Sequence, residues 1–345
     1  MSINRSIVHA LAAVCGCWFG GSAALAAETL DEIVLVDGSR VVGTITGARD
    51  GELTVDTSFA GTLTIQLDQV ESLVTGGPET LLLEDDSVIR EQRVRIVDGQ
   101  IASAVEPSSR YPVSALSAIN PEPWQLGRGY KWTGLIDFVL AFERGNSDID
   151  ELDYRLESAL RSVRDRFRVL LQGENDEADG EKIADNWLVR GKWDYFLEDP
   201  NYWGVLGQAE QDEFSDLDLR WLVGPFIGRQ IFDTPRFKMA GEFGASYVTE
   251  EFITAEDQDY PAANWDIDIS SDLLGGDSSL FLRQFGLWNL EETSDAVVNT
   301  TLGLSFPLMF DLQASAEIMW EYDSGAVENV DNLDETYRLR IGYTW

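Results

Sequence analysis

Charged side chains are the residues best suited to chemistry in this chain, and most of them are acidic. The 345 residues contain 61 Asp and Glu against 25 Lys and Arg, a formal net charge of −36. Carboxylate pairs can act as general acid and base, and a Ser–Lys pair can supply nucleophile and base. At this density, however, neighbouring carboxylates are expected by chance, so no particular pair predicts catalysis.

The first 26 residues predict a cleaved secretory signal. Arg5 supplies the positive charge, residues 7–19 form the apolar run, and Ala24-Leu25-Ala26 is a small-x-small cleavage motif. A lipobox at Val14-Cys15-Gly16-Cys17 is the alternative, with a very short apolar run. No later segment approaches about 18 consecutive apolar residues, so no transmembrane helix is predicted.

Histidine and cysteine chemistry is excluded by this signal. The only such residues, His9, Cys15 and Cys17, all lie within it. Cleavage therefore removes His-based triads, thiolate chemistry and Cys/His zinc sites. We expect no enzyme activity, no cofactor and no metal site. The acidic balance also argues against binding nucleic acid, because that requires basic patches.

The last strand-like segment indicates where the charges sit. Side chains alternate across a strand with period two, so one face here is apolar and the other polar or small. The apolar face contains Tyr337, Leu339, Ile341, Tyr343 and Trp345. This pattern is typical of a strand that closes a lipid-embedded barrel, although the final strand of a soluble sheet is an alternative. Tyr343 and Trp345 resemble the C-terminal signal read by the barrel assembly machinery.

Residues 130–345 predict about twelve such strands. Short connections alternate with longer acidic ones, expected at 174–181, 210–216, 250–259 and 323–334, as in barrels with tight periplasmic turns and longer outer loops. A soluble lipocalin-like barrel has the same alternation with the faces reversed. Strand length and opposite charges on the polar face favour lipid outside. The residues expected to face the lumen are Arg155, Glu157, Arg166, Arg168, Arg190, Lys192, Arg220, Glu317, Arg338 and Arg340.

Residues 27–120 form a separate β-rich module with an internal repeat. The segment that begins at Leu35 recurs at Leu83, an offset of about 48 residues, and the offset later shortens by about two. We interpret it as a paired SH3-like or Sm-like module in the periplasm. It is either a spacer or a platform for the cell wall or a periplasmic protein. Residues 121–129, rich in proline, predict a stiff linker without helix.

The motifs of the chain resemble a known family. Leu35-Val36-Asp37-Gly38-Ser39, Trp132-Thr133-Gly134 and Arg220 with Gly224, Gly228 and Gln230 resemble the domain of unknown function 481, which includes proteins called salt-induced outer-membrane proteins. The resemblance implies an outer-membrane barrel of a Gram-negative bacterium, in contact with outer-membrane lipid and without assigned biochemistry. Pro225 departs from a regular strand and predicts a bulge or a local break in pairing.

Three functions remain open from the sequence. The first is a non-enzymatic, structural or salt-stress-related envelope barrel. The second is a narrow channel for ions or small solutes, in which charge rings set selectivity. The third is adhesion or cation bridging by the acidic loops, of which 174–181 resembles a calcium loop in composition but lacks the EF-hand spacing.

Overall fold

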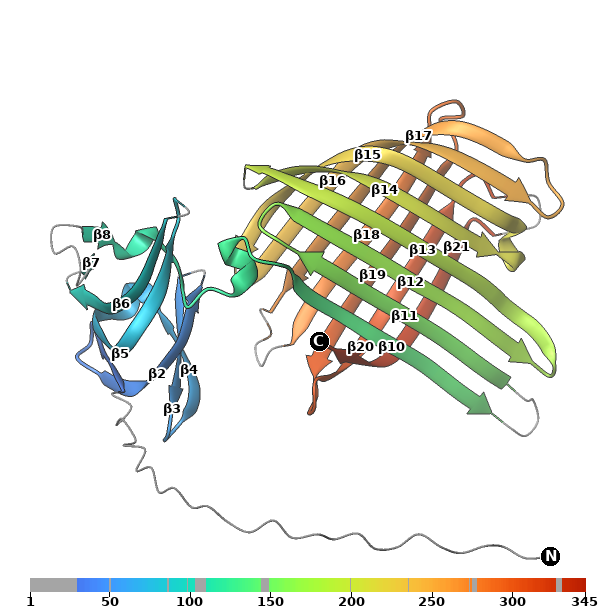
Figure 1. Ribbon diagram of the computed structural model, residues 1–345. Coiled ribbons are helices and arrows are strands. Elements are labelled where there is room, and N and C mark those ends of the chain that lie inside the picture. Colours follow the sequence, from blue (N-terminus) through green and yellow to red (C-terminus); the bar gives the residue numbers. More distant parts are fainter. Residues whose placement is uncertain are drawn as a thin grey trace, which may run out of the picture. The chain divides into compact units, whose positions relative to one another are not determined.

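The computed structural model describes residues 30–345 apart from 50, 86, 98, 103–109, 144–148, 199, 235, 273, 275–277 and 327–330. The predicted signal and the alternative lipobox lie outside these residues. The chain separates between Asn120 and Pro121 into two units, each built from antiparallel strands (Figure 1). Within the described residues, no helix reaches the length and apolarity that a membrane crossing requires.

The first unit is a nine-stranded sheet in the order β4-β3-β2-β1-β5-β6-β7-β8, with β9 pairing to β2 and β5. Its core contains buried aliphatic side chains from both halves of the sequence, including Ile33, Leu53, Leu81 and Ile96. The strands are β1 (Asp31–Leu35), β2 (Arg40–Arg49), β3 (Glu52–Thr57), β4 (Gly61–Gln66), β5 (Val70–Leu83), β6 (Val88–Val97), β7 (Gln100–Ala102), β8 (Arg110–Pro112) and β9 (Leu116–Ile119).

The sequence repeat is also a repeat of the fold. The hydrogen bond from Leu35 N to Ser39 O recurs 48 residues later from Leu83 N to Ser87 O, both at 2.9 Å. The strand pair Ile33↔Leu73 likewise recurs as Leu81↔Ile119. The start of β5 thus closes the first repeat, its end opens the second, and β9 closes the second. The SH3-like or Sm-like relationship stays a prediction.

The linker differs from the expectation that proline excludes helix there. Pro123–Leu126 form a 3-10 turn, and the Glu122 backbone N–H donates to Gln125 Oε1 at 2.9 Å. Pro123 stands at the start of the turn, where a missing N–H costs no hydrogen bond. The turn ends at Gly127, which has a φ of 72°.

The second unit is a closed barrel of twelve antiparallel strands, which confirms the predicted fold class and strand number. Each strand is at least 11 residues long, enough to cross a bilayer when tilted. The strands are β10 (Lys131–Glu143), β11 (Ile149–Arg161), β12 (Asp165–Ala178), β13 (Glu181–Glu198), β14 (Asn201–Asp212), β15 (Leu217–Thr234), β16 (Phe237–Phe252), β17 (Gln258–Ser271), β18 (Ser279–Asn289), β19 (Ala296–Pro307), β20 (Leu312–Asp323) and β21 (Leu333–Thr344).

The apolar face of the barrel points outward. Phe138 and Ile341 are 45% and 61% exposed, whereas the neighbouring inward residue Asp137 is 2% exposed. Because period-two alternation holds around the barrel, the outer band is apolar and the lumen carries the charges. The arrangement is the reverse of a lipocalin-like barrel.

This orientation predicts that the barrel needs detergent or lipid to stay folded. Purified in detergent, the protein should give a β-rich circular dichroism spectrum and migrate faster on a gel before heating than after it, because the barrel stays folded until heated. A cooperative unfolding transition of the barrel itself in buffer without detergent or lipid would contradict an apolar outer band.

The prediction of a long acidic loop at 174–181 is wrong. Residues 174–181 continue β12 and β13 to a two-residue turn, Asp179-Gly180, with φ values of 52° and 83°. Asp-Gly is a favoured sequence for tight hairpin turns, and this preference outweighs the repulsion among acidic neighbours. The other three expected connections are shorter than expected, at 213–216, 253–257 and 324–332.

Pro225 interrupts pairing on one side only. It pairs with Val205 of β14, but the β15–β16 ladder passes from Val223 to Phe226 without paired partners for Gly224 and Pro225. The register is the same on both sides of the gap, so the strand has a local break there and no bulge.

The seam that closes the barrel is the shortest strand pairing in it. Leu135–Phe138 of β10 pair with Ile341–Thr344 of β21. Two further backbone hydrogen bonds join Gly134 and Trp345, at 3.0 and 3.1 Å. The Trp345 ring lies over Gly134 and meets Trp132 edge-on at 5.5 Å. Tyr343 stacks on Trp345 at 6.4 Å, on the outer face.

Candidate functional site: an ion-paired lumen below an acidic vestibule

All ten charged residues expected to face the lumen point inward. Five of them, Arg155, Lys192, Arg220, Glu317 and Arg340, are less than 10% exposed. The other five are partly buried, and each contacts an oppositely charged or polar group from another strand. Burial of so many charges is tolerated only when they are paired. Most of the pairs form three groups along the lumen, and Arg220 and Arg338 pair nearer one end.

The first group, the seam cluster, consists of Arg155, Asp137, Glu317 and Arg340. These residues come from β11, β10, β20 and β21, so the cluster bridges the short seam from inside. Arg155 donates to Glu317 with both terminal nitrogens, at 3.1 and 2.8 Å, and to Asp137 at 2.9 and 2.7 Å. Arg340 donates to the other Asp137 oxygen at 3.0 Å. All four are buried, so each depends on its partners for stabilisation.

The second group, the central cluster, joins cations of β12 and β13 to carboxylates of β16 and β17. Lys192 Nζ lies 2.6 Å from carboxylate oxygens of both Glu242 and Asp266. Arg168 contacts Glu242 and, at 3.0 Å, Asp194. The Tyr202 hydroxyl also donates to Glu242, at 2.9 Å. These contacts reach across four strands, so they cross the lumen and do not merely line it.

The third group, the β18 crossing, joins β18 to the opposite wall. Arg283 Nη1 lies 2.5 Å from Glu157 of β11, five strands away around the barrel. The Arg190 guanidinium of β13 lies 3.7 Å from the centre of the Phe285 ring of β18. Together with the other two groups, these contacts place side chains across the space that an open pore would leave free.

Part of the lumen is apolar, which the sequence reading missed. Tyr202, Leu206, Leu222, Phe226 and Val248 belong to a buried cluster on the inner face of β14 to β18. This wall of the barrel is packed like a soluble core.

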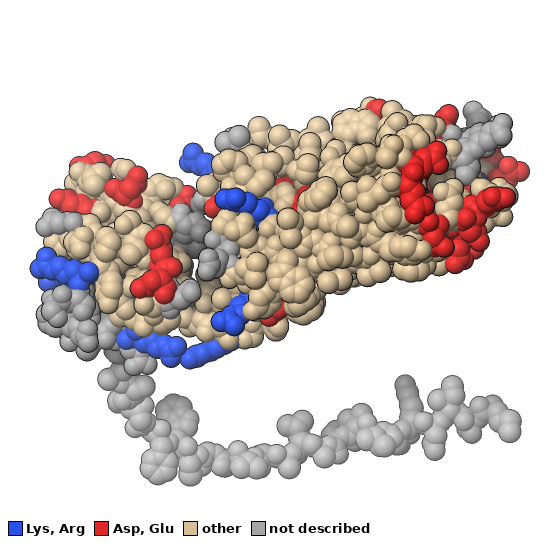
Figure 2. Space-filling model, turned by 90° about the horizontal axis from the view of Figure 1, so that it is seen from above, with Lys and Arg blue, Asp and Glu red and all other residues tan. Residues whose placement is uncertain are grey.

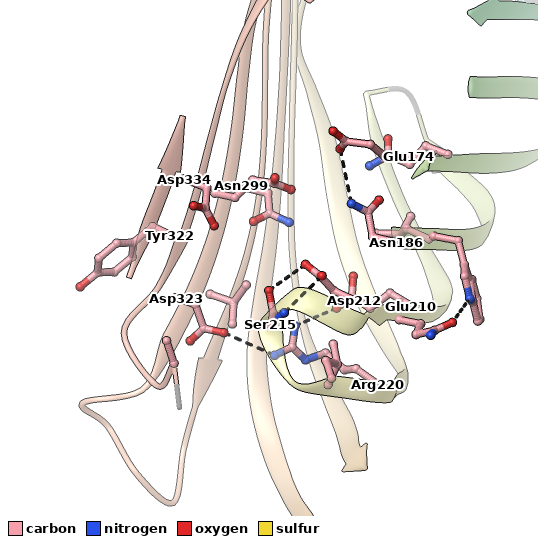
Figure 3. A pocket seen from close by; sticks show the side chains of 18 of the residues that line it. Glu174, Asn186, Glu210, Asp212, Ser215, Arg220, Asn299, Tyr322, Asp323 and Asp334 are labelled. Carbon is pink, nitrogen blue, oxygen red and sulfur yellow. Dashed lines mark hydrogen bonds and ion pairs between the residues drawn. The ribbon is translucent and has the colours of Figure 1, made fainter. Parts of the chain in front are cut away.

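A cavity of about 160 Å³ opens above these groups, at the end with the longer connections. We call it the acidic vestibule, and Figure 3 shows several carboxylates on its walls. Arg220 is bound there by Glu210 at 2.9 Å, Glu250 at 2.5 Å and Asp323 at 3.5 Å. Its acidic lining residues are Glu174, Glu210, Asp212, Glu250, Asp295, Glu321, Asp323, Asp331 and Asp334, against the cations Arg220, Arg338 and Arg340.

The imbalance of charge continues on the outside of this end. Figure 2 shows Asp and Glu side chains gathered at one end of the barrel, while the side of the barrel in view carries little charge. A concave, acidic entrance focuses the field and raises the local concentration of cations. Asp295, in the connection between β18 and β19, reflects this environment: burial and the nearby Glu250 raise its pKa, although a hydrogen bond from Asn289 opposes the rise.

Three carboxylates lie close enough together to suggest a metal site. One oxygen each of Asp153, Glu174 and Asp176 lies within 4.8 Å of the others. Arg338, however, is already 2.6 Å from Asp153 and 2.5 Å from Glu174. The guanidinium thus supplies the positive charge that two of the three carboxylates need.

The pairing of the carboxylates in the lumen could not be predicted from sequence. Asp137, Asp153, Asp194 and Glu242 are as buried as the cations they bind. Their inward position follows from alternation, but their partners lie up to several strands away. Only the closed barrel brings them together.

Comparison with known proteins supports the barrel assignment through sequence. Residues 136–345 match the family described as "Protein of unknown function, DUF481". No curated protein matches the chain.

Solved structures give only distant likenesses. The NanC porin has 11% identity and a TM-score of 0.39, over 61% of this chain and 98% of that chain. The CymD monoaromatic hydrocarbon channel has 9% identity and a TM-score of 0.32, over 65% and 90%. The outer membrane channel DcaP of Acinetobacter baumannii has 9% identity and a TM-score of 0.31, over 92% and 94%. At these scores the likenesses carry no argument about function. With a match over residues 136–345, more than half of its length, the chain belongs to the DUF481 family.

Proposed function

We propose that this protein is a non-enzymatic outer-membrane barrel of a Gram-negative bacterium, closed to solutes in its resting state, with an entrance that gathers cations. The observation that carries the proposal is the set of ion pairs that cross the lumen, above all Arg283–Glu157 and Lys192–Glu242. An open pore of twelve strands would leave its charges along the wall.

The orientation follows from the connections. Outer-membrane barrels have short periplasmic turns and longer external connections. The acidic vestibule would then face outward, among anionic headgroups bridged by divalent cations, and the barrel would contact outer-membrane lipid on its sides. The chain enters β10 from the short-turn end, which would put residues 30–120 in the periplasm. Tyr343 and Trp345 would serve as the signal to the barrel assembly machinery.

A role in envelope adaptation to salt fits the same features. Acidic side chains stay strongly hydrated, and the vestibule concentrates cations from outside. A surface adhesin that uses cation bridges is a second candidate, supported by the carboxylates at the outer end.

Recording from planar bilayers tests whether the lumen is closed. The wild-type protein should give no steady conductance over the usual range of voltages. The variant Arg190→Ala/Arg283→Ala removes the β18 crossing and should give brief, cation-selective currents, because Glu157 and Asp266 stay behind. The Arg283 side chain is 42% exposed, so its loss should leave the barrel folded.

Steady wild-type currents would contradict a closed lumen and support the alternative of a narrow channel. In that case Arg338→Glu, which changes the sign of charge next to the vestibule, should raise the preference for cations. Silence of both wild type and variant would mean that the apolar wall and the other ion pairs suffice to close the barrel.

A further inference from the structure

The two repeats of the first unit can be compared with each other, position by position. Because both repeats have the same fold, residues at equivalent positions show which side chains the fold itself requires. In the first repeat, Gly47, Thr54 and Thr64 form one row across β2, β3 and β4. Small and neutral residues therefore suffice at these three positions.

The equivalent row of the second repeat is different in charge. Arg95, Ala102 and Arg110 pair in the same order across β6, β7 and β8. The offsets are 48 residues for the first two positions and 46 for the third, as in the rest of the repeat. The fold does not require the change from Gly-Thr-Thr to Arg-Ala-Arg. The arginines therefore serve something other than folding.

These arginines are free to bind something else. Arg95 and Arg110 are exposed, and so is Arg93, two residues earlier on the same face of β6. Among the described residues, no carboxylate forms an ion pair with any of the three. By contrast, Arg40 of the first repeat is bound to Glu32 at 2.8 Å. Unpaired arginines are unexpected on a chain with a net charge of −36.

The geometry of the row suits an extended anionic ligand. Two strand spacings separate Arg95 from Arg110, roughly 10 Å, and the small Ala102 lies between them. Each guanidinium can hold a carboxylate with two parallel hydrogen bonds. The next row, Val97, Gln100 and Pro112, is uncharged, so it adds no repulsion or competing ion pair beside the arginines.

We propose that Arg95 and Arg110 bind a carboxylate-bearing polymer of the cell wall. The proposal rests on the periplasmic location given under the proposed function. A bilayer surface fits less well, because the described residues of this face include neither the aromatic side chains nor the lysines that anchor proteins at membrane interfaces. Tyr111, the aromatic residue of β8, packs against the core instead.

The test uses the full chain in nanodiscs of phosphatidylcholine and isolated peptidoglycan sacculi. Wild-type protein should sediment with sacculi, more weakly at high salt because exposed charges are screened. In Arg95→Thr/Arg110→Thr both positions become neutral, as they are in the first repeat, where Gly47 and Thr64 stand, and binding should fall at least tenfold. The matched control Arg40→Thr/Arg164→Thr removes two exposed charges elsewhere and should bind like wild type. Heat-dependent gel migration checks that the barrel of each variant is folded, and resistance of the first unit to limited proteolysis checks the unit that carries Arg95, Arg110 and Arg40.

Two results would overturn the proposal. One is equal binding by wild type and the Arg95/Arg110 variant, or equal loss in the control. The other is arginine-dependent binding to phosphatidylglycerol vesicles without binding to sacculi, which would assign the row to lipid phosphate. Labelling of intact cells tests the proposed location separately. Labelling of the first unit on the cell surface would contradict a periplasmic location. Sacculus binding by the purified protein, in contrast, tests the arginine row alone.

Discussion

Replacement of Arg155 by methionine should destabilise the barrel by about 3–5 kcal/mol, because it leaves two buried carboxylates without their main partner. Glu317 and Asp137 are 3% and 2% exposed. Arg340 remains near both, but it cannot replace the bidentate contact at 2.8 and 3.1 Å that Arg155 makes with Glu317. Urea titration of the barrel in lipid vesicles measures the change in the free energy of unfolding.

Two further variants show whether charge is the cause. Arg155→Met/Glu317→Gln removes one of the orphaned charges and should recover part of the loss. Arg283→Met makes the same substitution at a lumen residue that is 42% exposed, where an ion pair contributes at most about 1 kcal/mol. Equal destabilisation by Arg155→Met and Arg283→Met would show that burial of the seam cluster is unimportant.

The second large effect is expected at Gly224, where two strands approach closely. A Cβ atom at Gly224 would lie 2.6 Å from Ser246 Cα and closer still to the carbonyl oxygen of Ala245. Both are backbone atoms of β16, so no side-chain rotation relieves the clash. Gly224→Val should therefore cost at least about 3 kcal/mol, at the upper end of overpacking effects. The same titration measures it, together with the yield of the heat-sensitive compact band.

Gly207 gives the matched control. It lies in the middle of β14, and a Cβ there would meet no atom within 4 Å. Gly207→Val should change stability by less than about 1 kcal/mol. If Gly207→Val were as harmful as Gly224→Val, the loss of a strand glycine would be the cause, and the close approach of β15 and β16 would not.

The sequence predicted the strands and their faces because alternation is a local signal. Phe138 and Asp137 differ in polarity and are neighbours, so their opposite orientation can be inferred without any tertiary structure. The same reasoning placed all ten lumen charges. It was also sufficient to count twelve strands, since each is long and strongly patterned.

The contents of the lumen depend on closure, and the sequence carries no local signal for them. Arg155 and Glu317 are 162 residues apart, and nothing near either residue identifies the other as its partner. In β15 both faces are apolar: Trp221 is 38% exposed outside, while Leu222 is 1% exposed inside. Alternation of polarity therefore fails to separate the faces there, and the apolar wall of the lumen was missed.

Each repeat of the first unit is closed by a strand that also pairs with the other repeat. The start of β5 completes the first repeat but also pairs with β6, at Leu73↔Ile96, and β9 completes the second repeat but also pairs with β2, at Ala48↔Ile119. Neither half has a full set of neighbours by itself. The two halves are therefore interlocked, and the unit should be lost or kept as a whole, with no stable half-molecule between.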